Sequence, residues 1–437
     1  MSYYCVPITV FIALSLFAGA AAREVSLKTS ADDLLTVEGV DWGTSGYLPI
    51  KTMRTAGQLF YTYCPPRNGD ENAPLIFWLQ GGPGASGIAW GLLQEHGPFQ
   101  LVDGKPVHRE ISWNNEFGVL YIDQPVGTGF STAASNDSYA QNEYDVAEGL
   151  LDFLMKWADL GLWNRANPLF IAGESYGGHY VPALAHHMIT TKTSFNLKGI
   201  AIGDGLTDPA VQVLTKPKQA LAFGLIDLDL LPKVEALAQS AAKKCMEEDY
   251  LGAGQDRAAM EDVVTGASGI NPMDVRRFGG YSREAVAKWL NDPRTKAKLN
   301  VPTEIQFDTD YQVMESLADD VMRSWAFVFP ELLEALPVGV LLFQGQFDWK
   351  DGVTSNEAWV SQIDWQHAKG FHAANRSTWT MDGLPKGWGK SFHGLTEVVV
   401  AGSGHMVPMD QPEACLRLIT AFIRGESLFE QQKTAVI

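Results

Sequence analysis

Basic residues are few relative to acidic ones in this sequence. The chain of 437 residues has 33 Lys and Arg against 51 Asp and Glu, which gives a formal net charge of −18 at pH 7. Nucleic acids and anionic membrane surfaces would repel such a chain, so we expect neither as a partner. The charge suits an acidic compartment, where part of it is neutralised. Composition does not choose between lysosome, vacuole and exterior.

Long apolar runs are lacking, with one exception at the start of the chain. Residues 6–22 are apolar over the length of a signal peptide and end in three alanines, an A-x-A-like cleavage site. We therefore expect residues 1–22 to be a signal peptide and the mature protein to be secreted, lysosomal or vacuolar, without a stable membrane anchor. No Lys or Arg precedes Arg23, so a short membrane anchor remains the alternative.

Cysteine is also scarce, because the whole chain contains four. Cys5 would leave with the signal peptide, and the mature chain would keep Cys64, Cys245 and Cys415. Three thiols form one disulfide at most, and the sequence does not say which two would pair. A chain of this length buries a large core without such cross-links, so disulfides are optional here.

Metal-binding patterns are missing from the sequence. It has no H-E-x-x-H motif and no paired spacing of Cys and His, which disfavours a metal-dependent hydrolase. We therefore expect no metal and no cofactor, and catalysis by a side-chain nucleophile.

The most informative segment that is present is Pro168–Gly178, an apolar run that ends in Gly-Glu-Ser-Tyr-Gly. Ser175 has a glycine two positions away on either side, as in the G-x-S-x-G nucleophile elbow of α/β-hydrolases. Small flanking residues are needed because a Cβ there would collide with neighbouring backbone. The motif alone is a weak signal, but a buried strand before it and a helix after it favour Ser175 as the nucleophile.

A serine nucleophile needs a base and an acid that orients the base, in the chain order Ser, Asp, His in this fold. Asp348 follows the strand-like run Val338–Gly345, and His405 follows the run Thr396–Ala401 and a pair of glycines. Asp348 could instead cap the helix that follows it. We predict Asp348 as the orienting acid and His405 as the general base.

Glycines also follow the strand-like run Pro74–Gln80. The loop Gly81–Gly84 would let the backbone approach a ligand closely, as the oxyanion loop of lipases and esterases does. A tight turn that binds nothing is the alternative. Together with the elbow, this loop predicts an oxyanion hole that includes the Tyr176 N–H.

Four motifs in the same order resemble the serine carboxypeptidase family. They are Trp78–Gly84 (WLQGGPG), Asp123–Ser131 (DQPVGTGFS), Gly173–Gly177 (GESYG) and Gly404–Pro408 (GHMVP). Ser45–Leu48 and Gly203–Pro209 extend the resemblance over nearly the whole mature chain. Gln80 and the run from Gly345 to Trp359 are more similar to the retinoid-inducible branch. Two residues depart from the common pattern: Gln80 replaces the usual asparagine, and Ala85 replaces a cysteine that forms a disulfide in many relatives.

The resemblance implies a role for each matched residue. Ser175, Asp348 and His405 match the catalytic triad of the family, and the N–H groups of Gly82 and Tyr176 match its oxyanion hole. The family also has a subsite for the free terminal carboxylate of a peptide. The positions of that subsite are here Trp78, Gln80, Glu95 and Glu174.

The carboxylate subsite predicts a pH dependence. An ionised Glu174 would face negative charge from Glu95 and from the substrate, which raises a carboxyl pKa, so we expect the pair to keep and share one proton. Peptide cleavage should then be favoured at mildly acidic pH and decline as that proton is lost. His405 must be neutral to act as a base, which bounds activity on the acid side.

Apolar runs predict the fold class. Six read as buried strands: 75–79, 119–122, 169–172, 200–202, 338–343 and 398–401. Segments with helical spacing lie between them, which indicates an α/β-hydrolase fold with a mostly parallel central sheet flanked by helices. The segment 207–336 breaks the alternation, and we interpret it as an inserted, mainly helical cap between core parts 23–206 and 337–437.

These features favour a serine carboxypeptidase that hydrolyses peptide or protein C-termini through an acyl-enzyme on Ser175. An acyltransferase or esterase on the same triad is the alternative within catalysis, and a catalytically idle binding protein is the alternative outside it. Asn136 and Asn375 begin glycosylation sequons, which have meaning only in a chain that enters the secretory pathway. The sequence leaves the oligomeric state open, a homodimer included.

Overall fold

The structure is a computed structural model, and it describes residues 36–37, 40–307 and 311–429. The expected signal peptide, residues 1–22, lies outside these ranges. Among the helices in the described ranges, none combines the length and the apolar character that a membrane crossing requires.

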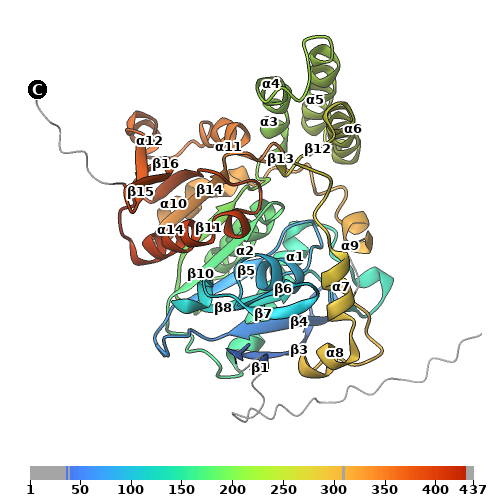
Figure 1. Cartoon of the computed structure of the whole chain (residues 1–437), viewed down its shortest axis with the longest axis vertical. Coiled ribbons are helices and arrows are strands. Elements are labelled where there is room, and N and C mark those ends of the chain that lie inside the picture. The colour runs from blue at the N-terminus through green and yellow to red at the C-terminus, as the bar shows by residue number, and fades with distance from the viewer. Residues whose placement is uncertain (1–35, 38–39, 308–310, 430–437) are drawn as a thin grey trace, which may run out of the picture. The chain divides into compact units, whose positions relative to one another are not determined.

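An 11-stranded sheet runs through the described part of the chain (Figure 1). Its strand order is β15–β16–β17–β14–β11–β10–β5–β8–β4–β3, and β9 pairs with β4 outside this path. The strands are β3 (Thr44–Lys51), β4 (Ala56–Cys64), β5 (Leu75–Leu79), β8 (Gly118–Asp123), β9 (Thr132–Ala133), β10 (Leu169–Glu174), β11 (Leu197–Gly203), β14 (Gly339–Gly345), β15 (Ser377–Met381), β16 (Leu384–Phe392) and β17 (Leu395–Val400).

The six central strands, β17, β14, β11, β10, β5 and β8, are parallel to one another. They are the six strands predicted from the apolar runs, and that prediction is confirmed. Parallel strands are covered on both faces, which is why their sequences are continuously apolar. Side chains alternate between two hydrophobic clusters, with Phe77 and Ile171 on one face and Ile76 and Phe170 on the other. The α/β-hydrolase fold predicted from the sequence is confirmed.

Helices cover both faces of the sheet. On the face of Phe77, α1 (Glu143–Ala158) packs against α2 (Gly177–Thr190), which in turn packs on β10 and β11. The other face is covered by the π-helical segment η2 (Ile88–Glu95) and by α14 (Pro412–Arg424). Asn142 caps α1, because its side-chain oxygen accepts the Asp145 N–H at 3.0 Å.

The segment 207–336 is mainly helical, as expected. It contains α3 (Pro209–Val213), α4 (Lys216–Ala222), α5 (Leu231–Met246), α6 (Tyr250–Ser268), the hairpin β12 (Ile270–Asn271) and β13 (Asp274–Phe278), α7 (Glu284–Leu290), α8 (Pro293–Lys298), α9 (Tyr311–Ser316) and α10 (Phe329–Ala335). Helices α4 to α6 share a hydrophobic cluster of their own with Trp349, whereas α7 and α10 contribute to the clusters on the sheet. The division of the chain at 207 and 336 stays a prediction.

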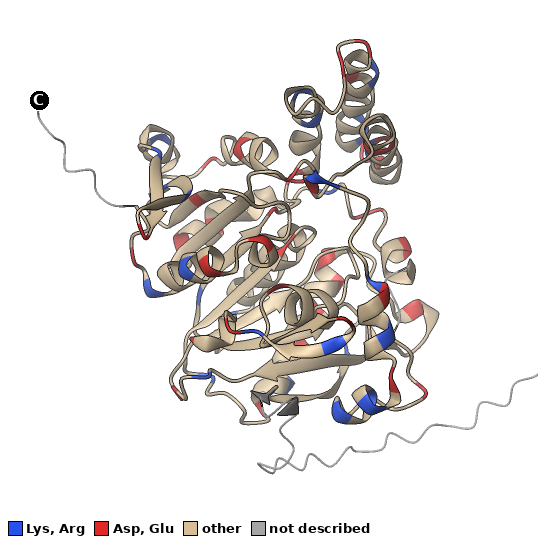
Figure 2. Cartoon of the chain, in the orientation of Figure 1, with Lys and Arg blue, Asp and Glu red and all other residues tan. Residues whose placement is uncertain are grey.

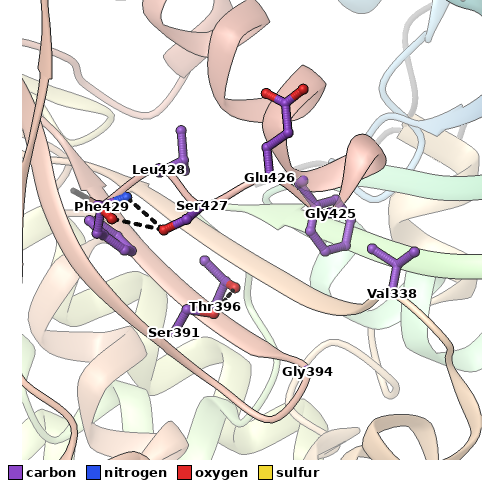
Figure 3. A pocket seen from close by; sticks show the side chains of 10 residues that line it. Val338, Ser391, Gly394, Thr396, Gly425, Glu426, Ser427, Leu428 and Phe429 are labelled. Atoms are coloured by element: carbon purple, nitrogen blue, oxygen red, sulfur yellow. Dashed lines mark hydrogen bonds between the residues drawn. The ribbon is translucent and has the colours of Figure 1, made fainter. Parts of the chain in front are cut away.

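Charged residues are spread over the helices and loops, with acidic and basic positions interspersed (Figure 2). A pocket of about 260 Å³ lies beside the C-terminal segment, lined among others by Val338, Gly394, Thr396 and Phe422 (Figure 3). Val338 and Gly394 directly precede β14 and β17. The pocket is therefore at the amino ends of these strands, whereas this class of sheet binds its ligands at the carboxyl ends.

Candidate active site

Ser175 lies in a sharp turn between β10, which ends at Glu174, and α2, which begins at Gly177. Its φ of 59° is in the left-handed region, where a residue with a Cβ is strained. Three backbone hydrogen bonds hold this conformation: the Ser175 N–H donates to the Gly203 carbonyl at 3.0 Å, and the N–H groups of Gly178 and Leu206 each donate to the Ser175 carbonyl at 2.9 Å. The structure thus has the strand, turn and helix predicted for a nucleophile elbow.

The glycine loop after β5 touches the elbow. A Cβ on Gly81 would lie 2.6 Å from the Tyr176 nitrogen and 2.8 Å from the Ser175 Cβ, so only glycine permits this approach. The Gly82 and Tyr176 N–H groups have no backbone hydrogen-bond acceptor among the described residues. Their role as the oxyanion hole stays a prediction.

Asp348 and His405 meet at the carboxyl ends of β14 and β17. The Nδ1 of His405 lies 2.8 Å from the Oδ2 of Asp348, and the two side chains are 2% and 0% exposed. Nε2, on the other side of the ring, has no hydrogen-bond partner among the described residues. Burial by itself lowers the pKa of His405, but the charge of Asp348 and the hydrogen bond to it outweigh burial and raise that pKa above its ordinary value.

The loop after β14 supplies two more donors to the Asp348 carboxylate. The Lys350 N–H donates to Oδ1 at 2.7 Å, and the Asp351 N–H donates to Oδ2 at 3.1 Å. With His405, this carboxylate accepts three N–H groups, and hydrogen bonds of this kind stabilise the ionised form. Asp348 is thus held by its own loop, in contact with His405.

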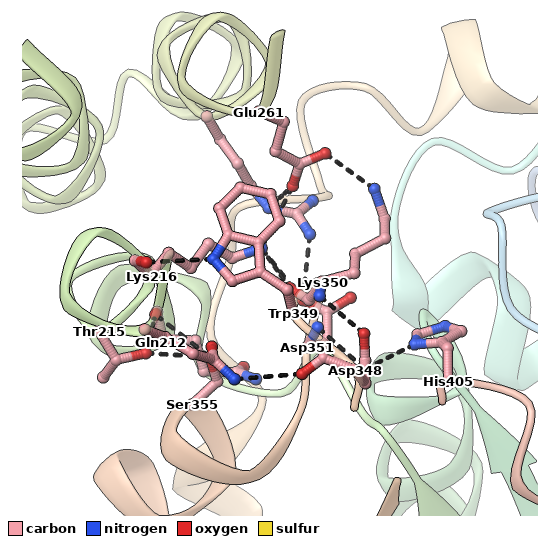
Figure 4. Close-up of polar contacts among 12 residues, drawn as sticks. Gln212, Thr215, Lys216, Glu261, Asp348, Trp349, Lys350, Asp351, Ser355 and His405 are labelled. Carbon is pink, nitrogen blue, oxygen red and sulfur yellow. Dashed lines mark hydrogen bonds and ion pairs between the residues drawn. The ribbon is translucent and has the colours of Figure 1, made fainter. Parts of the chain in front are cut away.

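Charged residues of the cap and of this loop together form a largely buried group (Figure 4). We call it the cap ion cluster, and its members are Lys216, Arg257, Glu261, Lys350 and Asp351. The Lys216 ammonium is 3.2 Å from Glu261 and also donates to the Lys350 carbonyl. The cluster joins three cations to two anions, so it places net positive charge beside the carboxylate of Asp348.

The four residues of the expected carboxylate subsite also lie together. The Trp78 indole N–H donates to Gln80 Oε1 at 2.7 Å, and Gln80 Nε2 donates to Glu174 Oε1 at 2.8 Å. An indole can only donate, so it fixes which end of the amide faces Glu174. Trp78 thus orients Gln80 toward Glu174, and its contact with a substrate stays a prediction.

Glu95 and Glu174 form a coupled pair of buried carboxyl groups. Burial raises the pKa of Glu95 to about 7. Burial, followed by the negative charge of Glu95, raises the pKa of Glu174 well above its ordinary value. Two adjacent carboxyls in a low dielectric do not both ionise readily, so the pair retains a proton at mildly acidic pH.

Asp204 is a third acid at this site, and the sequence analysis did not single it out. One polar atom from each of Asp204, Asp348 and His405 lies within 4.8 Å of the others. The distances alone would suit metal ligands, but the Gly345 N–H already occupies the Asp204 oxygens and Asp348 already binds His405. We therefore assign no metal to this group.

The sequence profile of the serine carboxypeptidase family matches residues 42–425. A protein of Dictyostelium discoideum named probable serine carboxypeptidase CPVL is 34% identical over 424 residues, covering 91% of this chain and 83% of its own length. The chain belongs to the serine carboxypeptidase family. Another relative, the venom serine carboxypeptidase of Apis mellifera, is 32% identical over 404 residues, covering 87% of this chain and 84% of its own length.

A solved structure of a yeast protein has the same fold as this serine carboxypeptidase family member. Kex1Δp, a prohormone-processing carboxypeptidase of Saccharomyces cerevisiae, aligns with a TM-score of 0.78 over 87% of this chain and 91% of that chain, at 23% identity. The expected membership in the family is confirmed, and the expected retinoid-inducible branch is consistent with the CPVL match.

The remaining predicted positions lie away from the triad. Asn136 and Asn375 are both exposed, as a glycosylated residue must be, and their modification stays a prediction. No disulfide joins any two of Cys64, Cys245 and Cys415 within the described residues, and all three side chains are buried. The cap ion cluster was missed because its members are up to 135 positions apart in the sequence and share no motif.

Proposed function

We propose that this serine carboxypeptidase family member hydrolyses the terminal peptide bond of substrates with a free C-terminal carboxylate, through an acyl-enzyme on Ser175. The observation that carries the proposal is that Glu174, bound to Gln80 and paired with Glu95, directly precedes the nucleophile. A substrate whose scissile carbonyl reaches Ser175 would therefore have its terminal carboxylate near this pair. A protonated carboxyl can donate a hydrogen bond to it.

We assign each step of the proposed reaction to a group of this site. Ser175 Oγ attacks the carbonyl carbon, His405 Nε2 accepts the hydroxyl proton, and Asp348 stabilises the imidazolium that results. The N–H groups of Gly82 and Tyr176 receive the negative charge on the carbonyl oxygen. His405 then donates its proton to the leaving amino acid. A water molecule activated by the same histidine hydrolyses the acyl-enzyme.

The pKa of the carboxylate subsite gives this activity an upper pH limit. Near pH 7 Glu95 ionises, and Glu174, whose pKa is raised further by the charge of Glu95, loses the last proton of the pair at higher pH, where two carboxylates repel the substrate carboxylate. Peptide cleavage should therefore decline as the pH rises. On the acid side, His405 must lose its proton to act, and its raised pKa brings that limit toward neutrality.

The test is the hydrolysis of N-blocked dipeptides with a free C-terminus, with their C-terminal amides as controls and Ser175→Ala alongside. We expect release of the terminal amino acid from the free acids, little from the amides, and none by the variant. Turnover of esters or acyl transfer without peptide cleavage would replace the proposal with an esterase or acyltransferase. No turnover and no labelling of Ser175 by a serine-directed probe would favour a binding protein.

We also propose that the protein enters the secretory pathway, on the basis of the apolar segment 6–22 and the exposed Asn136 and Asn375. Treatment of the protein from its native source with an N-glycosidase should then reduce its mass. If the glycosidase leaves the mass of the wild-type protein unchanged, and if Asn136→Gln and Asn375→Gln have that same mass apart from the substitution, neither site is modified.

A further inference from the structure

Asp204 lies at the centre of the active-site edge of the sheet. It directly follows β11, which pairs on one side with β10, the strand that leads to Ser175, and on the other with β14, the strand that leads to Asp348. Its side chain is 0% exposed, and its φ of 41° is in the left-handed region. Full burial makes this position unfavourable for an ionised side chain, because the charge is removed from bulk water.

Two buried carboxyl groups face one another at this position. One carboxylate oxygen of Asp204, one of Asp348 and one ring nitrogen of His405 lie within 4.8 Å of one another, and both acids are fully buried. Like charges this close in a low dielectric do not ionise together. A proton held by one of the two acids would remove this repulsion.

The hydrogen-bond donors decide which acid is ionised. Asp348 accepts three N–H groups, at 2.8 Å, 2.7 Å and 3.1 Å, and adjoins the net positive cap ion cluster. Within the described ranges, Asp204 accepts a single N–H, that of Gly345, which is 3.0 Å from each of its oxygens. Donors stabilise the carboxylate that receives more of them, so the negative charge belongs on Asp348 and the proton on Asp204.

We propose that Asp204 is a positioning residue of this active site, which retains a proton and donates it in a hydrogen bond to the Asp348 carboxylate. That bond fixes the carboxylate against His405 without adding a second negative charge. The inference rests on the proposed function, because it takes Asp348 and His405 as the acid and base of Ser175. Burial and the charge of Asp348 raise the pKa of Asp204 well above its ordinary value, in agreement with a retained proton.

Other titratable groups lie near Asp204 and Asp348 and contribute to the electrostatic environment of the two acids. Those that act on Asp204, Asp348 or His405 are Glu95, Glu174, Lys350, Asp351, Arg257 and Cys415. They are unchanged in the variants below, so a shift in the pH profile reports the charge at position 204.

The test compares Asp204→Asn, Asp204→Ala and the control Asp208→Asn. Asparagine keeps an oxygen for the Gly345 N–H and an N–H for Asp348, and it is neutral, as protonated Asp204 would be. Asp208→Asn makes the same chemical change four residues away, outside the trio. For each protein, the rate of Ser175 labelling by a fluorophosphonate and kcat/KM for an N-blocked dipeptide are measured against pH.

We expect Asp204→Asn to stay within a few-fold of wild type and to leave the acid limb of both profiles where it is, as Asp208→Asn does. Both rates should fall about 10- to 100-fold in Asp204→Ala, which is the effect expected when one hydrogen bond to a charged group is lost. An acid limb that moves to lower pH in Asp204→Asn would mean that wild-type Asp204 is ionised, because removal of a negative charge lowers the pKa of His405. Wild-type rates in Asp204→Ala would mean that the residue positions nothing.

Two further results distinguish a failure of the proposed function from a failure of the role assigned to Asp204. If wild type labels at Ser175 but cleaves no peptide, the proposed function fails while the labelling profiles still test Asp204. If Asp204→Ala does not fold, the infrared difference spectrum between wild type and Asp204→Asn decides. A protonated carboxyl band that the variant lacks supports the inference, and a carboxylate band in its place overturns it.

Discussion

Gly81 shows how one missing side chain shapes the site. Its α-carbon lies against the elbow so closely that a methyl group would contact the Glu174 carbonyl and the Tyr176 nitrogen, each at 2.6 Å. The sequence predicted that this loop approaches a ligand. The structure adds that the loop also packs against the nucleophile turn.

Gly81→Ala should therefore separate the loop from the elbow and lower kcat/KM for peptides by about 100- to 1,000-fold, the loss typical of a removed oxyanion donor. The matched control is Gly266→Ala in α6, where an added Cβ meets nothing within 4 Å. We expect that variant to keep full activity and to gain up to about 1 kcal/mol in the free energy of unfolding. Equal activity of the two variants would contradict the packing described.

Glu174→Gln should change the shape of the pH profile for peptides. Glutamine fills the same space and cannot ionise, so the decline of kcat/KM toward high pH should flatten, while its maximum is lower. The control Glu148→Gln alters an exposed carboxyl on α1 and should keep the wild-type profile. A variant that declines as steeply as wild type would show that this pair does not set the upper limit.

At the scale of elements, the central sheet was predictable and its margins were not. Strands β5, β8, β10, β11, β14 and β17 are buried on both faces and therefore read as apolar runs. The antiparallel strands β3, β4, β15 and β16 extend the sheet at its two sides. Strand β16 contains two glycines and two lysines, so its sequence does not show the apolar run by which the central strands were recognised.

Site residues within motifs were predictable from the resemblance. Asp204 lay within such a motif, but its contact with Asp348 depends on three neighbouring strands.

The link between the cap helices and the Asp348 loop gives a prediction for α4. Lys216→Met removes a fully buried ammonium and leaves Glu261 and Asp351 with less compensation, which should cost about 3 to 5 kcal/mol in the free energy of unfolding. Lys218→Met makes the same change at an exposed position of the same helix and should cost less than about 0.5 kcal/mol. Urea unfolding measures both. Equal costs would show that the cluster does not hold the cap on the loop.

At the scale of the whole molecule, the buried acids predict how stability depends on pH. Eight carboxyl groups among the described residues have a raised pKa, with burial as the first cause: Glu95, Asp123, Glu143, Glu174, Asp204, Asp208, Asp320 and Glu397. Between the pKa of an unfolded carboxyl, about 4.5, and the raised values, the folded chain binds more protons than the unfolded chain. The free energy of unfolding then falls as the pH rises.

Two buried imidazoles oppose this trend, because burial lowers the pKa of His96 and lowers that of His179 to about 4. They favour the folded state above about pH 6.5, but the acids outnumber them. We expect the melting temperature to be highest near pH 5 and to fall steadily toward pH 8, as scanning calorimetry at matched ionic strength would show. A melting temperature that rises from pH 5 to pH 8 would contradict this balance.

The most direct test of the central claim follows one linear peptide of about ten residues and its C-terminally amidated twin by mass spectrometry across the range from pH 5 to pH 8. A carboxypeptidase that depends on Ser175 and on the carboxylate subsite should produce a ladder of successive C-terminal losses from the free acid and leave the amide almost intact. The Ser175→Ala protein should act on neither. Internal or N-terminal cleavage, or equal action on the acid and the amide, would contradict the account.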